Sequence, residues 1–363
     1  MRERGSDIFL LFGGGALLML GCLLLLLFPQ PQFSERENRM LAAMPHYSAA
    51  AMIDGSYAAA FESYATERIP YRNEMRSVRA VLELAMGKQE IGGVVLCRDG
   101  SLAARPSHNK RLYQQNISTL GKLGNAASIA VIPRRIDARG VQLPLGYSNA
   151  PSNSGYAELA EHLPHALVAS FLPADCWYRT DHHLTSEGAY ALYAALGAAL
   201  GYTPLPKSAF TPVTVSEDFF GTADAAAGIP HVAPDEISLW RYEGDEDISV
   251  IKDGVPAAFG LYDLSRLKTR DKYSVFLGGN DAITVIEPSK KSADDLRPTL
   301  FLIKDSFANA LIPFLARHFR IVAADPRYGS IDVARETENA DKTLVILGMA
   351  TLSETPLSRG FVF

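Results

Sequence analysis

The stretch that decides the fold is Tyr178-Arg179-Thr180-Asp181-His182-His183-Leu184-Thr185-Ser186-Glu187-Gly188-Ala189-Tyr190. It places a carboxylate two residues before an imidazole, at the point where helical spacing begins. An enzyme with a serine nucleophile needs a histidine as general base and a carboxylate that fixes the histidine tautomer. The stretch therefore predicts half of a catalytic triad, with Asp181 and His183 as its members.

The serine that completes such a triad is expected at a sharp turn between a strand and a helix, where the hydroxyl is exposed near helical N–H groups. Ser306 has this setting, because it follows the apolar run 300–303 and precedes a helical pattern. The same position also suits a helix N-cap, and the local sequence does not separate these roles. A polar turn or a metal site is the alternative for His182 and His183. Neither HExxH nor CxxC accompanies the pair, so we expect no metal.

The composition indicates a globular protein without a nucleic-acid partner. Of the 363 residues 48% are hydrophobic and 21% are charged, and the formal net charge is -5. These values are ordinary for an α/β protein and give no basic footprint. A Ser-His-Asp triad works without a cofactor, and we expect none.

The N-terminus predicts a membrane anchor. Residues 8–28 form an uncharged apolar run that is long enough to cross a bilayer as a helix. Arg2 and Arg4 precede this run, so we expect residues 1–7 in the cytoplasm and the rest of the chain outside the cell membrane. A cleaved signal peptide and lipidation at Cys22 are the alternatives.

Beyond the anchor, residues 29–90 are expected to form a linker and helical lead-in, and residues 91–363 a catalytic domain. Alternating strand and helix patterns at 299–347 predict a parallel sheet flanked by helices, with the site at the carboxyl ends of its strands. The segment at about 203–291 reads as an irregular insertion of short strands and loops. Cys97 and Cys176 could pair in a disulfide or remain two buried thiols.

Several motifs resemble those of known esterases and acyltransferases. The entry His183-Leu184-Thr185-Ser186-Glu187-Gly188 resembles that of SGNH/GDSL-type esterases, and Asp305-Ser306 resembles the end of their nucleophile motif. The order, with Asp-x-His before Ser, is similar to that of the periplasmic alginate O-acetyltransferases. The chain most resembles the bacterial DHHW protein family, through Ser34-Glu35-Arg36-Glu37-Asn38-Arg39, Asp54-Gly55-Ser56-Tyr57, Arg68-Ile69-Pro70-Tyr71-Arg72, Thr180-Asp181-His182-His183, Tyr262-Asp263-Leu264, Phe276-Leu277-Gly278-Gly279-Asn280, Lys304-Asp305-Ser306-Phe307-Ala308-Asn309 and Asp325-Pro326-Arg327-Tyr328.

This resemblance implies an SGNH-like, flavodoxin-like α/β fold with a circularly permuted motif order. Ser306 would be the nucleophile, His183 the general base and Asp181 the residue that orients it. The implied activity is transfer of an acyl group, by resemblance acetyl, to a cell-surface or exported polysaccharide. A membrane-bound O-acyltransferase would deliver the acyl group. A carbohydrate acetylesterase and a non-catalytic glycan-binding or scaffold component are the alternatives.

Further site residues are expected from the same resemblance. Asn280 and Asn309 compete as side-chain donors to the oxyanion, although Asn280 also suits a tight turn and Asn309 could face its own helix. Arg327 and Tyr328 follow a predicted strand and could hold a sugar at the rim of the site or lie in a surface loop. Two positions depart from the family pattern. Leu184 replaces a Trp that would form an aromatic wall beside the base. Lys304 replaces a Gly and is expected to pair with a carboxylate.

Overall fold

The computed structural model describes residues 12–16, 19–21, 32–37, 39–69, 71–105, 109–148, 150–290 and 295–362. The chain divides into two compact units, residues 1–87 with 228–230 and residues 88–227 with 231–363. The expected membrane span at 8–28 lies largely outside the described residues. Among the residues that are described, no helix has both the length and the apolar character needed to cross a bilayer.

The first unit is mainly helical. A short strand pair, β1 (Phe33–Ser34) and β2 (Arg39–Met40), precedes α2 (Ala49–Ile53), α3 (Ser56–Glu67) and α4 (Arg72–Ala85). Helix α2 begins where the Ser48 side chain accepts a hydrogen bond from the N–H of Ala51, which satisfies one of its unpaired donors. Glu37 forms ion pairs with Arg72 and Arg76, which tie the strand pair to α4.

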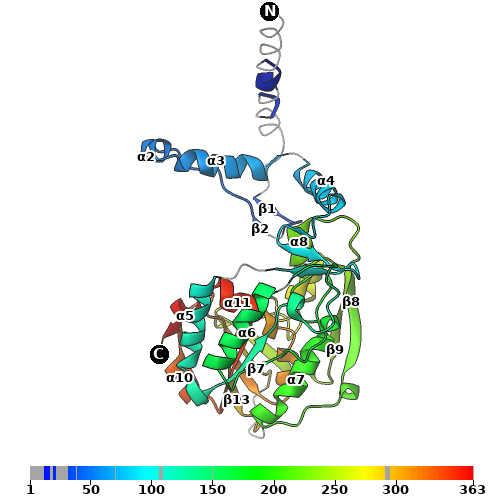
Figure 1. The fold of residues 1–363 in the computed structure, drawn as a ribbon. Coiled ribbons are helices and arrows are strands. Elements are labelled where there is room, and N and C mark those ends of the chain that lie inside the picture. Colours follow the sequence, from blue (N-terminus) through cyan, green and yellow to red (C-terminus); the bar gives the residue numbers. More distant parts are fainter. Residues whose placement is uncertain are drawn as a thin grey trace, which may run out of the picture. The chain divides into compact units, whose positions relative to one another are not determined.

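The described part of the second unit is built on an eight-stranded mixed sheet of order β11-β10-β12-β14-β13-β16-β6-β7 (Figure 1). Strands β14, β13, β16, β6 and β7 run parallel. Counted along the chain from β13, with β6 and β7 placed last, their spatial order is 2-1-3-4-5, as in flavodoxin-like sheets. The strands are β6 (Ser128–Ile132), β7 (Leu167–Val168), β10 (Ile248–Lys252), β11 (Val255–Pro256), β12 (Ile283–Pro288), β13 (Thr299–Lys304), β14 (Arg320–Ala324) and β16 (Lys342–Gly348).

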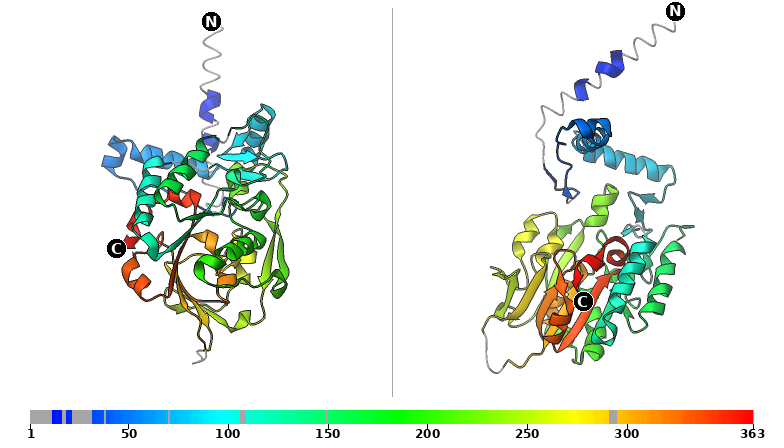
Figure 2. Two further views of the ribbon diagram at one scale, coloured as in Figure 1. Left: turned by 60° about the horizontal axis from the view of Figure 1, so that its bottom comes forward. Right: turned by 90° about the vertical axis from the view of Figure 1, so that its left-hand side faces the viewer.

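Helices cover both faces of this sheet because its central strands are apolar on both sides. Phe301 and Ile303 of β13 pack in the core cluster shared with α5 (Lys110–Gly121), α6 (Ala150–His162), α10 (Val333–Glu338) and α11 (Met349–Glu354). Leu300 and Leu302 point to the opposite face, which is covered by α7 (Ser186–Leu200) and α9 (Ile312–Leu315). Figure 2 shows α5, α6 and α11 together on one side of the strands.

The remaining strands form smaller sheets within the second unit. Strands β3 (Glu90–Ile91), β4 (Val94–Leu96) and β5 (Leu102–Ala104) form an antiparallel sheet that is separate from the main sheet. Strands β8 (Thr211–Phe219) and β9 (Asp235–Arg241) form a bulged hairpin. Strands β15 (Ile331–Asp332) and β17 (Phe361–Val362) pair in parallel.

Two expectations about this unit need correction. The segment 203–291 consists of short strands and loops, as expected, but it is not separate from the main sheet, because β10, β11 and β12 extend that sheet by antiparallel pairing. The helical pattern expected after Ser306 is instead a 3-10 turn, Ser306–Ala308, followed by the four-residue α9. Pro313 in the first turn of α9 has no N–H to donate, so a continuous helix through it would lose a hydrogen bond.

Candidate active site

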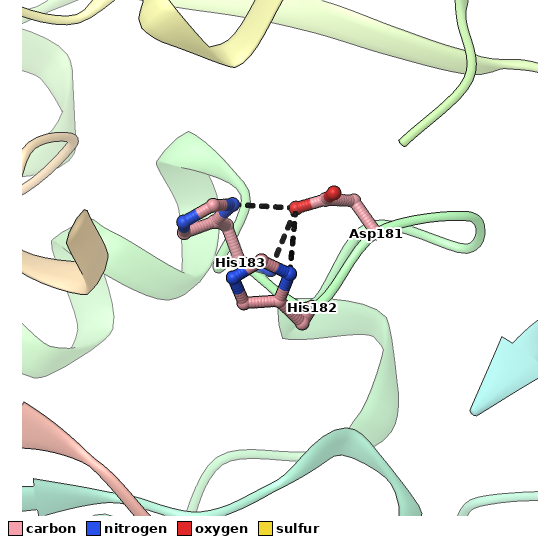
Figure 3. Close-up of side chains that lie close together, drawn as sticks. All are labelled: Asp181, His182 and His183. Atoms are coloured by element: carbon pink, nitrogen blue, oxygen red, sulfur yellow. Dashed lines mark hydrogen bonds and ion pairs between the residues drawn. The ribbon is translucent and has the colours of Figure 1, made fainter. Parts of the chain in front are cut away.

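The structure brings Asp181, His183 and Ser306 into one chain of hydrogen bonds. The Nε2 atom of His183 lies 2.8 Å from Ser306 Oγ, and its Nδ1 lies 2.5 Å from Asp181 Oδ1. Asp181 and His183 are buried, and Ser306 is half-buried. Figure 3 shows the Asp181 carboxylate facing the ring of His183. With the proton on Nδ1, the free Nε2 can accept the hydroxyl hydrogen of Ser306.

The surroundings of Asp181 keep it ionised. Burial by itself raises the pKa of this carboxyl. The charges of His182 and His183, together with hydrogen bonds from His183 and Thr222, lower the pKa by more than burial raises it. The pKa of Asp181 therefore lies below its ordinary value. The backbone N–H and hydroxyl of Thr222 donate to Asp181 Oδ2 at 2.7 and 3.0 Å. Gly221 permits this approach, because a Cβ at that position would lie 2.2 Å from the Cβ of Asp181.

Tyr273 forms the aromatic wall beside His183. The two rings stack with centroids 3.7 Å apart and an interplanar angle of 7°. The Tyr273 hydroxyl donates to the carbonyl oxygen of Ser306 at 3.1 Å, which links the base to the turn that carries the serine. Burial raises the pKa of Tyr273 well above its usual value, so the hydroxyl stays protonated and remains a donor.

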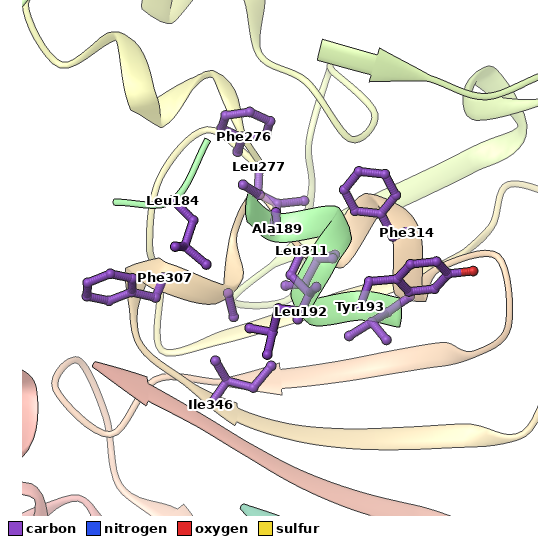
Figure 4. Packing of buried hydrophobic residues seen from close by; sticks show 14 of the residues in the cluster. Leu184, Ala189, Leu192, Tyr193, Phe276, Leu277, Phe307, Leu311, Phe314 and Ile346 are labelled. Carbon is purple, nitrogen blue, oxygen red and sulfur yellow. The ribbon is translucent and has the colours of Figure 1, made fainter. Parts of the chain in front are cut away.

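Leu184 is not the wall residue that the family pattern suggested. Its side chain is fully buried in the apolar core, near Phe307 (Figure 4). An isolated bridge pairs Leu184 with Trp177. Since successive side chains of an extended segment point to opposite faces, Leu184 turns inward directly after His183 turns toward the site. Replacement of Trp at this position therefore changes the core and not the contact with the base.

Asp305 holds the turn that presents Ser306. This side chain is fully buried, and its Oδ1 accepts the N–H of Phe307 at 2.9 Å. Its Oδ2 accepts the N–H of Gly348 at 2.7 Å and the hydroxyl of Thr351 at 2.6 Å. These bonds join the ends of β13 and β16. The Asp before the serine is therefore the N-cap of the turn, and Ser306 is left free to face His183.

Lys304 has amide partners instead of the expected carboxylate. Its buried Nζ donates to Asn280 Oδ1 at 2.9 Å and to Asn309 Oδ1 at 2.7 Å, and the Asn309 amide donates to Asn280 at 3.2 Å. Burial lowers the pKa of Lys304 to about 8, although the charge of Asp325 opposes the shift. Asn280 follows Gly278 and Gly279 in a tight turn of positive φ. Neither asparagine is among the residues lining the cavity at Ser306.

Ser306 opens into a cavity of about 310 Å³. Four adjacent parallel strands supply its wall from their carboxyl ends, which is where open α/β sheets bind ligands. The lining residues are Ala104, Arg134, Arg135, Asp181, His182, Thr222, Ala223, Ser306, Phe307, Arg327, Ala350, Thr351, Glu354 and Thr355. Arg327 is therefore in the wall, and its guanidinium pairs with Asp325 through two contacts of 2.9 and 2.6 Å. Tyr328 is exposed and is not part of this lining.

His182 lies beside the triad but is not part of the hydrogen-bonded chain. Its Nδ1 lies 2.6 Å from the hydroxyl of Thr222, and desolvation together with the charge of His183 lowers its pKa. Asp181, His182 and His183 offer ligand atoms within 4.8 Å of one another, a spacing that could hold a metal ion. Asp181 Oδ1 and His183 Nδ1, however, already bond to each other, so a metal there would displace the bond that orients His183.

Three contributors to the site were not predicted from the sequence. Tyr273 and Thr222 come from the insertion and reach the site only through the fold. Asp305 was noted as part of a motif, but its three acceptor contacts had no local signal. Gly221 was the available clue to Thr222, since a glycine can mark a point where the backbone approaches another part of the chain closely. Cys97 and Cys176, whose pairing the sequence left open, are both buried free thiols.

Several solved structures are similar to this chain, and the first two described here share its fold. A DHHW family protein from Eubacterium siraeum has a TM-score of 0.58 and 20% identity, with 76% of this chain and 97% of that chain covered. PatB1 of Bacillus cereus has a TM-score of 0.57 and 15% identity, with 73% and 98% covered. The O-acetyltransferase domain of Pseudomonas putida AlgJ has a TM-score of 0.40 and 15% identity, with 72% and 93% covered.

No curated protein matches the chain. Residues 147–324, just under half of the chain, match the family model described as DHHW protein. This match includes Asp181, His183 and Ser306, whereas the motifs quoted from residues 34–72 and the motif Asp325-Pro326-Arg327-Tyr328 lie outside it. The resemblance drawn from the motifs is thereby confirmed: the chain carries a DHHW-family region at residues 147–324.

Proposed function

We propose that this protein is an O-acyltransferase that moves an acetyl group to a hydroxyl of a cell-surface or exported polysaccharide. The observation that carries the proposal is the hydrogen-bonded chain from Asp181 through His183 to Ser306, at the mouth of a cavity. This series of hydrogen bonds lowers the free energy needed to remove the serine proton at the moment of attack. The family resemblance supplies the substrate class.

In the first half-reaction, Ser306 Oγ attacks the carbonyl carbon of the acyl donor while its proton moves to His183 Nε2. Ser306 is the first residue of a 3-10 turn, so its N–H has no acceptor within that turn and can donate to the oxyanion. The C–O bond to the leaving group then breaks, and His183 returns the proton to the departing oxygen. Ser306 is left as an ester.

In the second half-reaction, a glycan hydroxyl takes the place of the leaving group. His183 accepts the hydroxyl proton, the glycan oxygen attacks the acyl carbon, and the bond to Ser306 Oγ breaks as the serine recovers its proton. Asp181 stabilises the imidazolium in both halves through its contact with Nδ1. Water could attack the acyl carbon in place of the sugar hydroxyl. Whether a glycan or water occupies the acceptor side of the cavity therefore decides whether the protein acts as a transferase or as an esterase.

The proposal includes a membrane setting. Residues 8–28 would anchor the chain, with the catalytic unit on the outer face of the cell membrane. A membrane-bound O-acyltransferase would supply the acetyl group from the other side. This arrangement explains why the chain would need no soluble donor of its own.

The experiment measures acetyl release from a model ester by purified protein, with and without an oligosaccharide acceptor. A transferase should form acetylated oligosaccharide at the expense of free acetate, and Ser306→Ala should form neither. Turnover to acetate alone, unaffected by any acceptor, would favour an esterase. If Ser306→Ala left polysaccharide acetylation intact in cells while deletion abolished it, the protein would be a scaffold.

A further inference from the structure

A second cavity, of about 470 Å³, shares Arg135 with the cavity at Ser306. Its size is within the range of small-molecule sites, about 300–1,000 Å³. Several of its lining residues belong to the segment 173–185, which also contains Asp181 and His183. The lining residues are Asp99, Arg135, Arg139, Gly140, Pro173, Ala174, Asp175, Trp177, Arg179, Thr185 and Asp235.

The arginines of this lining differ in how much of their side chain a ligand could contact. Arg135 and Trp177 are more than nine-tenths buried, and Arg135 Nε and Trp177 Nε1 are enclosed by protein atoms and have no acceptor among the described residues. The other nitrogens of Arg135 are used, since Nη1 and Nη2 donate to Leu102 O and Ser101 Oγ at 3.3 and 2.8 Å. Arg139 is exposed, and within the described part of the chain its side chain makes no hydrogen bond or ion pair. A ligand oxygen can therefore reach the guanidinium of Arg139, whereas the enclosed nitrogens of Arg135 and Trp177 are out of its reach.

Acceptors are also available there. Asp175 is exposed and its carboxylate bonds to none of the described residues. Asp99 uses Oδ1 for the N–H and hydroxyl of Ser101, at 3.1 and 2.5 Å, whereas no described group bonds to its Oδ2. Asp235 is fully used, because both its oxygens accept from Arg179 and Thr180.

The charges of the cavity balance, with three guanidinium groups against three carboxylates in its lining. An anionic ligand would meet Asp99 and Asp175, and a cationic ligand would meet Arg135 and Arg139. A hydroxyl group both donates and accepts, so an uncharged ligand with several hydroxyls can satisfy the free donors and the free acceptors together.

We propose that the second cavity is a subsite for an uncharged, hydroxyl-rich sugar of the acceptor glycan, next to the sugar that receives the acyl group. This inference rests on the proposed acyltransferase function and adds the class of acceptor. Arg135 lines both cavities, so it contacts the glycan between the two sugars. The acceptor must then be longer than one sugar to use both cavities.

The test titrates full-length Ser306→Ala protein in detergent with three hexasaccharides, in a calorimeter. Cellohexaose and N-acetyl-chitohexaose are uncharged, and hexagalacturonate carries a carboxylate on each sugar. We expect an uncharged hexasaccharide to bind at least tenfold more tightly than hexagalacturonate. Arg139→Gln and Asp175→Asn, added separately, should each weaken that binding about tenfold, as expected for a hydrogen bond to a charged group. Glu246→Gln, an exposed acid outside both cavities, is the matched control.

The inference is overturned if hexagalacturonate binds most tightly, if neither uncharged hexasaccharide binds, or if neither substitution changes the affinity. Acylation of Ser306 in the wild-type protein is measured separately, from intact mass after incubation with a model ester. Failure of that acylation would reject the proposed function whatever glycan binds. Normal acylation together with a failed titration would reject the subsite alone.

Discussion

Replacing Asp181 by Asn tests whether this carboxylate sets the tautomer of His183. An Asn amide offers one oxygen, whereas Asp181 accepts from His183 through Oδ1 and from Thr222 through Oδ2. If the amide nitrogen faces His183, Nδ1 must become the acceptor and Nε2 carries the proton, so Nε2 can no longer accept from Ser306. If the amide oxygen faces His183, the amide NH2 group faces the backbone N–H of Thr222, and two donors then meet without an acceptor.

The first arrangement removes the base, and in serine proteases the equivalent substitution lowers kcat about 10⁴-fold. At 1.36 kcal/mol for each tenfold change in rate, this corresponds to about 5–6 kcal/mol in the activation barrier. The second arrangement costs about 1–3 kcal/mol of folding stability, the usual penalty for an unsatisfied buried group. We therefore expect Asp181→Asn to lose about three to four orders of magnitude in kcat and to remain folded near neutral pH.

The assay is turnover of a model ester, with unfolding by urea measured on the same samples and Glu246→Gln as control. The pKa of Asp181 is lowered in the folded protein, so its ionised form contributes stability above its ordinary pKa, near 4, and loses this contribution as the pH falls. The stability difference between wild type and Asp181→Asn should thus narrow below about pH 4. A folded variant with turnover within about tenfold of wild type would refute this account of Asp181.

Three further predictions concern neighbours of the triad. His183→Asn should reduce model-ester turnover at least about 10³-fold and His182→Asn less than about tenfold; equal losses would contradict His183 as the base. Lys304 has a pKa lowered to about 8 from 10.5, so between these values the unfolded chain binds a proton that the folded chain lacks, and stability rises with pH. Urea unfolding should show wild type gaining about 2 kcal/mol over Lys304→Met from pH 8 to 9.5, and parallel curves would contradict the shift. Leu184→Trp should overpack the core and cost about 1–3 kcal/mol without raising turnover, so a more active variant of unchanged melting temperature would contradict the inward position of Leu184.

The sequence was sufficient to predict which residues would meet at Ser306 because their signals are local. Asp181 and His183 are two residues apart, and Ser306 follows an apolar run that predicts a buried strand. The parallel order of the central strands also followed from the alternation of strand and helix patterns. Each of these inferences needs only chain neighbours and periodicity.

The rest depended on contacts between distant segments, which periodicity does not encode. Tyr273 stacks on His183, which lies 90 positions earlier in the sequence, and the pattern around Tyr273 predicts only an irregular insertion. The position of Leu184 was misjudged because adjacency to His183 suggested a shared surface, whereas side chains alternate in extended backbone. The partners of Lys304 are amides because the turn at Asn280 packs under the end of β13, a contact with no sign in either segment.

The most direct test of the central claim is the mass of the protein after brief incubation with an acetyl ester, followed by peptide mapping. The account predicts that wild type gains one acetyl group, that the modified peptide carries it on Ser306, and that added oligosaccharide removes it while becoming acetylated. Ser306→Ala should gain none. An acetyl group on another residue, or turnover with Ser306 absent, would contradict the claim that Ser306 carries the acyl group.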